Sequence, residues 1–212
     1  LFLSMRAAIR SHVAALAHDE TAALKYMDFA LSILEPAQPR LIAVGGLSGT
    51  GKSSLARELA PSVNPLPGAL ILRSDVVRKQ LAGVDQFTQL EDEGYSPEMT
   101  RRTYDQMYQD AAVGLLAGHS VIVDAVFARV EERAAIRNVA ANAGVNFDGI
   151  WLVAEPAIAE QRISRRSNDA SDATVDILHQ QLGYDIGAID WPKIESSANL
   201  IDVMRSISEI LH

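Results

Sequence analysis

One run of residues constrains this chain more than any other. Gly46-Leu-Ser-Gly-Thr-Gly-Lys52-Ser53 fits the pattern G-x-x-x-x-G-K-[ST]. The apolar run 41–44 before it predicts a short buried strand, and residues 53–60 after it predict a helix that ends at Pro61. Glycines let successive backbone N–H groups point into one concavity, and the start of the helix adds partial positive charge there. This order of elements predicts a polyphosphate-binding loop.

Each part of the loop has a predicted task. Lys52 can reach the β- and γ-phosphates of a nucleoside triphosphate and act on the transferring group, and the Ser53 hydroxyl can ligate Mg²⁺. No Asn-Lys-x-Asp run, the signature of a GTPase, occurs in the sequence, so ATP is the default expectation and guanine preference stays open. The residues expected to surround the nucleotide are Gly46, Leu47, Ser48, Gly49, Thr50, Gly51, Lys52, Ser53 and Ser54.

Strand-like and helix-like segments alternate over residues 38–212. This alternation predicts an α/β fold in which helices cover both faces of a five-stranded parallel sheet, which is the three-layer sandwich of P-loop nucleotide-binding domains. Pro192 indicates that the last strand lies at an edge or begins there. The apolar runs that predict the strands are 41–44, 69–72, 121–123, 150–153 and 191–194.

Residues 1–37 predict a helical appendage or linker rather than part of the nucleotide-binding core at 38–212. Apolar residues recur there at near-helical spacing in two stretches, and residues 18–21 offer a break and a helix cap. Two helices packed on the core are a better expectation than a catalytic role, and whether they dock stays open. The chain starts at Leu1 within the first of these helices, which indicates a piece of a longer protein.

Composition excludes several classes of site. Of the 212 residues, 48% are hydrophobic and 22% are charged, which is ordinary for a soluble globular protein. No apolar run approaches the roughly 20 residues that span a bilayer. The absence of cysteine excludes disulfides and cysteine-ligated zinc, and a cytoplasmic location is expected. The net charge of −8 disfavours nucleic acid as a partner.

Asp75 and Arg78 follow the second predicted strand. In a sheet of this kind, ligands bind at the carboxyl ends of the strands. A spacing of three places both side chains on one helix face. Asp75 can take a proton from a substrate hydroxyl while Arg78 holds an anionic substrate or the transferring phosphoryl group. A helix cap with a surface partner is the structural alternative.

Two more groups complete the predicted site. Asp124 ends the third predicted strand, where an acid that orders Mg²⁺ is expected, and Ala125 beside it replaces the glutamate that motor ATPases commonly use. Arg162, Arg165 and Arg166 precede a polar stretch, which predicts a lid that brings a guanidinium to the developing charge. Arg162 and Arg165 are the catalytic candidates, and solvated helix charges are the alternative.

These residues resemble the P-loop kinases related to polynucleotide kinase, zeta toxins and chloramphenicol phosphotransferase. The resemblance rests on 46–54, 74–78, 121–124 and 162–166. The Asp75/Arg78 pair is similar to the one that supplies the base and a phosphate-contacting arginine in polynucleotide kinases. More closely, the chain resembles the C-terminal ATP-binding half, an AAA-type domain, of bacterial proteins whose N-terminal half is similar to aminoglycoside phosphotransferases. The resemblance therefore implies a fused upstream domain as a partner.

Together these observations predict an ATP- and Mg²⁺-dependent kinase that phosphorylates a hydroxyl of a small molecule. One alternative is an ATP-binding regulatory module of a larger two-domain protein. Another is a kinase that acts on a polynucleotide or a nucleotide-sugar. The sequence leaves open the acceptor, the oligomeric state and the identity of the lid arginine.

Overall fold

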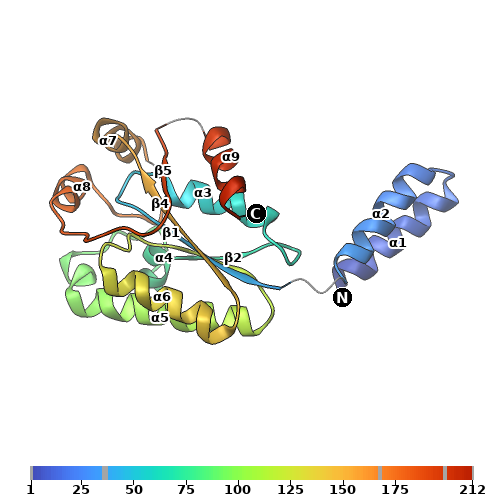
Figure 1. Cartoon of the computed structure of the whole chain (residues 1–212), viewed down its shortest axis with the longest axis horizontal. Coiled ribbons are helices and arrows are strands. Elements are labelled where there is room, and N and C mark those ends of the chain that lie inside the picture. The colour runs from blue at the N-terminus through green and yellow to red at the C-terminus, as the bar shows by residue number, and fades with distance from the viewer. Residues whose placement is uncertain (1, 35–37, 167–168, 198–199, 212) are drawn as a thin grey trace.

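The computed structural model describes residues 2–34, 38–166, 169–197 and 200–211 and shows an α/β fold around one sheet (Figure 1). Five strands, all parallel, lie in the order β2-β3-β1-β4-β5. This confirms the predicted fold class. The strands are β1 Arg40–Gly45, β2 Leu70–Arg73, β3 Val121–Asp124, β4 Asn146–Val153 and β5 Lys193–Glu195.

The register brings three strand ends together. Val44 of β1 and Arg73 of β2 both lie opposite Asp124 of β3. The phosphate-binding loop follows the carboxyl end of β1, and the helix that carries Asp75 follows the carboxyl end of β2. The predicted chemistry therefore gathers at the carboxyl ends of the three strands.

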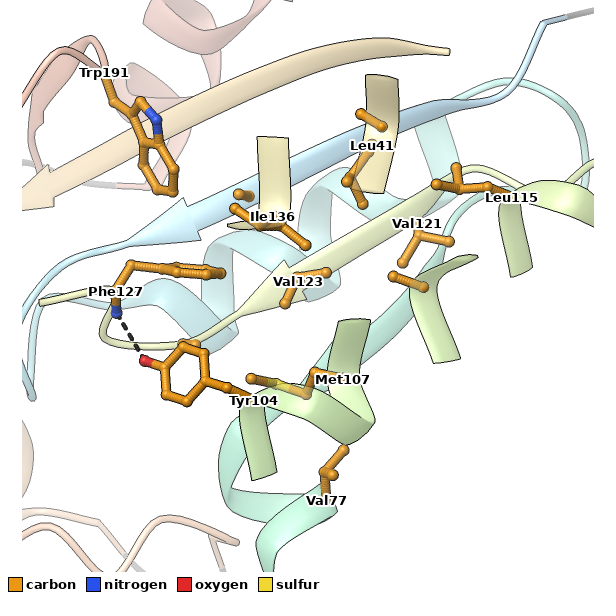
Figure 2. Packing of buried hydrophobic residues seen from close by; sticks show 14 of the residues in the cluster. Leu41, Val77, Tyr104, Met107, Leu115, Val121, Val123, Phe127, Ile136 and Trp191 are labelled. Atoms are coloured by element: carbon orange, nitrogen blue, oxygen red, sulfur yellow. Dashed lines mark hydrogen bonds between the residues drawn. The ribbon is translucent and has the colours of Figure 1, made fainter. Parts of the chain in front are cut away.

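One face of the sheet packs against α5 (Pro97–Leu116) and α6 (Val130–Ala143). Leu41, Val121 and Val123 point to this side and contact Met107 and Ile136 (Figure 2). Tyr104 of α5 lies here too, and its hydroxyl accepts a hydrogen bond of 3.0 Å from the backbone N–H of Phe127. Tyr104 and Phe127 are both buried.

The opposite face packs against α3 (Lys52–Leu59) and α9 (Leu200–Leu211). Because side chains alternate along a strand, Ile42 and Ile122 point to this side and meet Leu55, Val203 and Ile207. Helices on both faces make the predicted three layers. The other helices described after residue 38 are α4 Ser74–Leu81, α7 Pro156–Ser164 and α8 Val175–Leu182, and two short 3₁₀ turns are η1 Ala60–Ser62 and η2 Asp92–Tyr95.

The N-terminal segment forms a helical hairpin, α1 (Phe2–Leu16) and α2 (Glu20–Ser32), which stands apart from the sheet in Figure 1. The Asp19 side chain caps α2 by accepting from the N–H of Ala22. The hydroxyls of Ser4 and Ser11 donate across the hairpin to backbone carbonyls of α2. The two predicted helices therefore form and pack on each other.

Element boundaries differ from the predicted ones where tertiary pairing decides them. β4 starts four residues earlier than predicted, at Asn146, because it pairs with β1 from Arg40 onward. β5 starts at Lys193 instead of 191, and the buried ring of Trp191 packs on Gly149, where a Cβ would lie 2.5 Å from it. β5 is an edge strand, as Pro192 indicated. The last helix begins at Leu200.

The second strand shifts by one residue. β2 runs over 70–73 where 69–72 was predicted, so Arg73 belongs to the strand. Ser74 and Asp75 then lie in the first turn of α4, and neither side chain caps it. Among the described residues, no helix has the length and apolar character needed to cross a membrane.

Candidate functional site

The loop between β1 and α3 needs its glycines. Gly46, Gly49 and Gly51 have φ values of 135°, 80° and 93°. A Cβ on Gly46 would lie 2.5 Å from the carbonyl of Leu152, and one on Gly49 would lie 2.6 Å from that of Ala159. No side chain caps α3, whose first residue is Lys52. The first N–H groups of the helix are therefore left for a ligand, which suits an anion.

Lys52 lies at the floor of this loop. Its Nζ donates a hydrogen bond of 2.9 Å to the carbonyl of Leu47. Close packing of protein around the ammonium lowers the pKa of Lys52, and the charges of Asp124 and Asp75 oppose that shift. A phosphate beside Nζ would favour the charged ammonium.

The two residues predicted to ligate Mg²⁺ are in contact. Ser53 Oγ donates to Asp124 Oδ2 at 2.6 Å, and Arg73 Nε lies 3.5 Å from the same oxygen. No group of three or more His, Cys, Asp or Glu residues within the described ranges could hold a metal by itself. Mg²⁺ keeps several waters and is held by one or two protein oxygens together with substrate phosphates. A hydroxyl and a carboxylate beside a phosphate-binding loop fit that requirement.

Asp75 faces the same space from the start of α4. Lys52, Ser53, Asp75 and Asp124 all line one cavity of about 1310 Å³. Water reaches part of Asp75, yet burial raises the pKa of its carboxyl. The negative charge of Asp124 raises it further, and a hydrogen bond with Ser171 lowers it. A carboxylate with a raised pKa is a stronger proton acceptor.

Arg78 lies on the wall of this cavity and is 7% exposed. Its Nη1 donates to the carbonyl of Gly94 at 3.0 Å and to Oγ1 of Thr100 at 3.2 Å. Its guanidinium lies over the Tyr95 ring, 5.0 Å from the centroid. Arg78 therefore joins α4 to η2 and α5, as a structural link beside Asp75.

The three predicted lid arginines all line a second pocket, and one of them also reaches the large cavity. Arg162 and Arg165 line a second pocket of about 510 Å³ behind the phosphate-binding loop, whereas Arg166 lines both pockets. Nη2 of Arg162 donates to the carbonyl of Ser196 at 2.6 Å. Its Nη1 is buried without a hydrogen-bond partner among the described residues. Of the three, only Arg166 lines the cavity that holds Lys52 and Asp75.

Residues 169–173, here called the strap, line part of the cavity. They belong to the polar stretch that was predicted to form a lid. Asp169 Oδ1 accepts from Arg73 Nη2 at 2.6 Å. Asp172 accepts from Lys79 Nζ at 2.8 Å, from the Tyr95 hydroxyl at 2.7 Å and from the N–H of Leu90 at 3.0 Å. These contacts hold the strap beside Asp75.

Sequence reasoning missed several residues that organise the site. Arg73 sits at a strand end directly before Ser74-Asp75, a position that could have drawn attention. Gln181 of α8 accepts a 2.8 Å bond from the N–H of Ser48, and no local pattern predicts this contact. Arg133 donates to four carbonyls, those of Phe127, Ala128, Ile186 and Ala188, at 2.8 to 3.0 Å. It fixes two loops that flank the cavity.

Comparison with known proteins agrees with this geometry. A family described as AAA domain matches residues 41–184. Uncharacterized proteins of Mycobacterium tuberculosis and Mycobacterium bovis are 33% identical over 159 residues, which are 73% of this chain and 31% of theirs. The chain therefore spans about a third of the length of these curated relatives.

Solved structures share the fold at low identity. A sugar kinase from Janibacter has a TM-score of 0.57 at 19% identity, over 82% of this chain and 94% of its own. The Mycobacterium tuberculosis APS kinase in complex with AMPPNP and APS has a TM-score of 0.58 at 20% identity, over 83% and 99%. A gluconokinase from Sinorhizobium meliloti has a TM-score of 0.52 at 19% identity, over 80% and 90%.

Proposed function

Because the chain belongs to this AAA domain family and has the fold of P-loop kinases, we propose that it is an ATP- and Mg²⁺-dependent phosphotransferase that acts on a hydroxyl of a small molecule. One observation carries the proposal. A single cavity is lined by the phosphate-binding loop, by the Ser53–Asp124 pair and by Asp75. Phosphoryl transfer needs a polyphosphate site, ligands for Mg²⁺ and a group that activates the acceptor hydroxyl, all within reach of one another.

Each of the two pockets would receive a different part of ATP. The loop amides and Lys52 would hold the polyphosphate at the cavity floor. The second pocket, which reaches the far side of the same loop, would take the nucleoside. Arg162 suits that role because its flat guanidinium can stack on a base, and its Nη1 has no partner among the described residues.

Ser53 and Asp124 would hold Mg²⁺ together with the phosphates. The metal would supply charge neutralisation for the transferring group and hold it in line. Lys52 adds a cation on the same side. Arg166, which reaches both pockets, is the candidate for the guanidinium that meets the developing charge.

Asp75 would accept the proton of the acceptor hydroxyl as the oxygen attacks the γ-phosphorus. The hydrogen bond with Ser171 of the strap orients the carboxylate. The strap also limits the water that reaches it, which protects the phosphoryl group from hydrolysis. Asp75 therefore acts as the general base in this proposal.

The test is transfer of the labelled γ-phosphoryl group from ATP to members of a panel of hydroxyl compounds, measured as labelled product. We expect acceptor-dependent transfer by the unaltered chain and a loss of about 100-fold or more in Lys52→Ala. Lys193→Ala, an exposed lysine on β5, is the matched control and should behave like the unaltered chain. Tight ATP binding with no transfer to any compound would support the regulatory module instead.

A further inference from the structure

The large cavity extends well beyond the phosphate site. It continues between the first turns of α5 and α6, where Tyr95, Tyr104 and Tyr108 form part of its wall. Under the proposed function this end receives the acceptor, because it lies on the Asp75 side of the phosphate-binding loop. The charged side chains in its lining therefore indicate which charge the acceptor has.

Carboxylates outnumber cations at this end. Away from the residues that surround the phosphate site, the lining contains three arginines, Arg78, Arg101 and Arg129. Against these stand five carboxylates, Glu98, Asp105, Glu131, Glu132 and Asp185. An anionic acceptor would enter a region of net negative charge, which costs free energy at such short range.

Two of these arginines are already engaged by the protein. Arg101 lies 3.2 Å from Glu98 Oε1 and 3.1 Å from Asp105 Oδ2. Arg78, which would have been the contact for an anionic substrate, holds Gly94 and Thr100 and covers Tyr95. Neither guanidinium is therefore set up as an anion receptor.

Glu132 is the carboxylate best placed to meet a cation. It lies in the first turn of α6, is partly buried, and accepts a 3.1 Å bond from the N–H of Arg129. That bond fixes the carboxylate, so it needs little reordering to bind a ligand. The half-buried ring of Tyr108, whose hydroxyl donates to the carbonyl of Glu132 at 3.2 Å, adds an aromatic face that attracts cations.

We propose that the acceptor is a hydroxyl compound that carries a positive charge, as an amino sugar or amino alcohol does. The proposal rests on the function proposed above. The ammonium would lie near Glu132 and the tyrosines, and the hydroxyl near Asp75. This placement uses the surplus of carboxylates and leaves the Arg78 and Arg101 contacts intact.

The experiment is calorimetric titration of two matched sets of compounds into the protein loaded with a non-hydrolysable ATP analogue and Mg²⁺. One set is glucosamine, glucose and gluconate; the other is aminopropanediol, glycerol and glycerate. Titrations run at about pH 6.5, below the ordinary pKa of an amine of this kind. We expect the cation to bind most tightly in at least one set, about 10-fold or more above the anion.

The variant Glu132→Gln keeps the hydrogen bond to the N–H of Arg129 and removes the charge. It should reduce the preference for the cation by about 10-fold, whereas Glu58→Gln on the exposed side of α3 should leave it unchanged. Equal or tighter binding of the anions, or no cation preference in either set, with the analogue bound would overturn this inference alone. Failure of the analogue to bind would overturn the proposed function, and this inference with it.

Discussion

Lys52 and Asp75 have pKa values shifted toward their neutral forms, because burial of each group disfavours its charged form. Burying an ionisable group in this way destabilises the folded state, and the group is then placed to act on a bound ligand. The raised pKa that makes Asp75 a stronger base therefore also lowers the stability of the folded protein at neutral pH.

Asp75→Asn should stabilise the protein at neutral pH. The pKa of Asp75 is higher in the folded state than in the unfolded chain, so its contribution is favourable below the unfolded pKa and is lost as pH rises through the folded one. The neutral amide avoids that loss. We expect a melting temperature about 2–4 °C higher at pH 7, and a difference that disappears in acid, measured by calorimetry.

Ser53→Ala should weaken the Mg²⁺-dependent part of ATP binding. In the proposed function the metal is held by Ser53 Oγ and the Asp124 carboxylate, which lie in contact, so losing the hydroxyl removes a ligand and leaves phosphate binding by the loop intact. We expect about a 10-fold weaker Kd for ATP with Mg²⁺ and little change with EDTA. Ser206→Ala, at an exposed position of α9, is the control. An equal loss of ATP affinity in EDTA would contradict the metal role.

At the scale of elements, two carboxylates fix the strap: Asp169 pairs with Arg73, and Asp172 makes the larger set of contacts. Asp172 joins it to α4 through Lys79, which is 1% exposed, and to η2 through Tyr95. Burial alone would raise the pKa of Asp172, but the bonds from Lys79 and Tyr95 outweigh it and keep the pKa below its usual range. The pairing therefore stabilises the fold above the acidic range and is lost as pH falls through the folded pKa.

Asp172→Asn should destabilise the protein by about 3 kcal/mol in urea unfolding at pH 7, because it leaves a buried ammonium without its anion. Combining it with Lys79→Met should restore much of that loss. Tyr95→Phe removes one hydrogen bond and should cost about 1 kcal/mol. Equal stability of the Asp172→Asn variant and the unaltered chain would show that the strap is not held by this ion pair.

The whole molecule is a sheet domain with a hairpin beside it. The hairpin exposes large apolar residues on both helices, among them Phe2, Ile9, Leu16, Leu24 and Leu31. Its two helices bury little beyond Ser4, Ala7, Ser11 and Ala30 against each other. The sheet domain keeps its own two apolar layers without it.

Removing residues 1–37 should therefore leave the sheet domain folded and able to bind ATP. We expect the melting temperature to change by less than about 2 °C and the Kd for ATP by less than about 2-fold. Binding of a dye that fluoresces on apolar surfaces should fall. A cooperative loss of structure on truncation would contradict the division at residue 38.

The sequence predicted the order of strands and helices because each central strand is a continuous apolar run between turn residues. It also predicted which carboxylates stand at strand ends, since parallel strands finish at one edge. It did not predict the Arg73–Asp169 and Lys79–Asp172 pairs, which join residues more than 90 positions apart. It grouped Arg162, Arg165 and Arg166 by spacing, and all three do line the second pocket, but spacing could not predict that only Arg166 also reaches the large cavity.

The most direct test of the whole account compares the unaltered chain with Asp75→Asn in two assays, ATP binding with Mg²⁺ and acceptor-dependent phosphoryl transfer. If Asp75 is the base of a kinase, the Kd for ATP stays within about 2-fold while transfer falls by about 100-fold or more. Transfer by Asp75→Asn at close to the unaltered rate would contradict it.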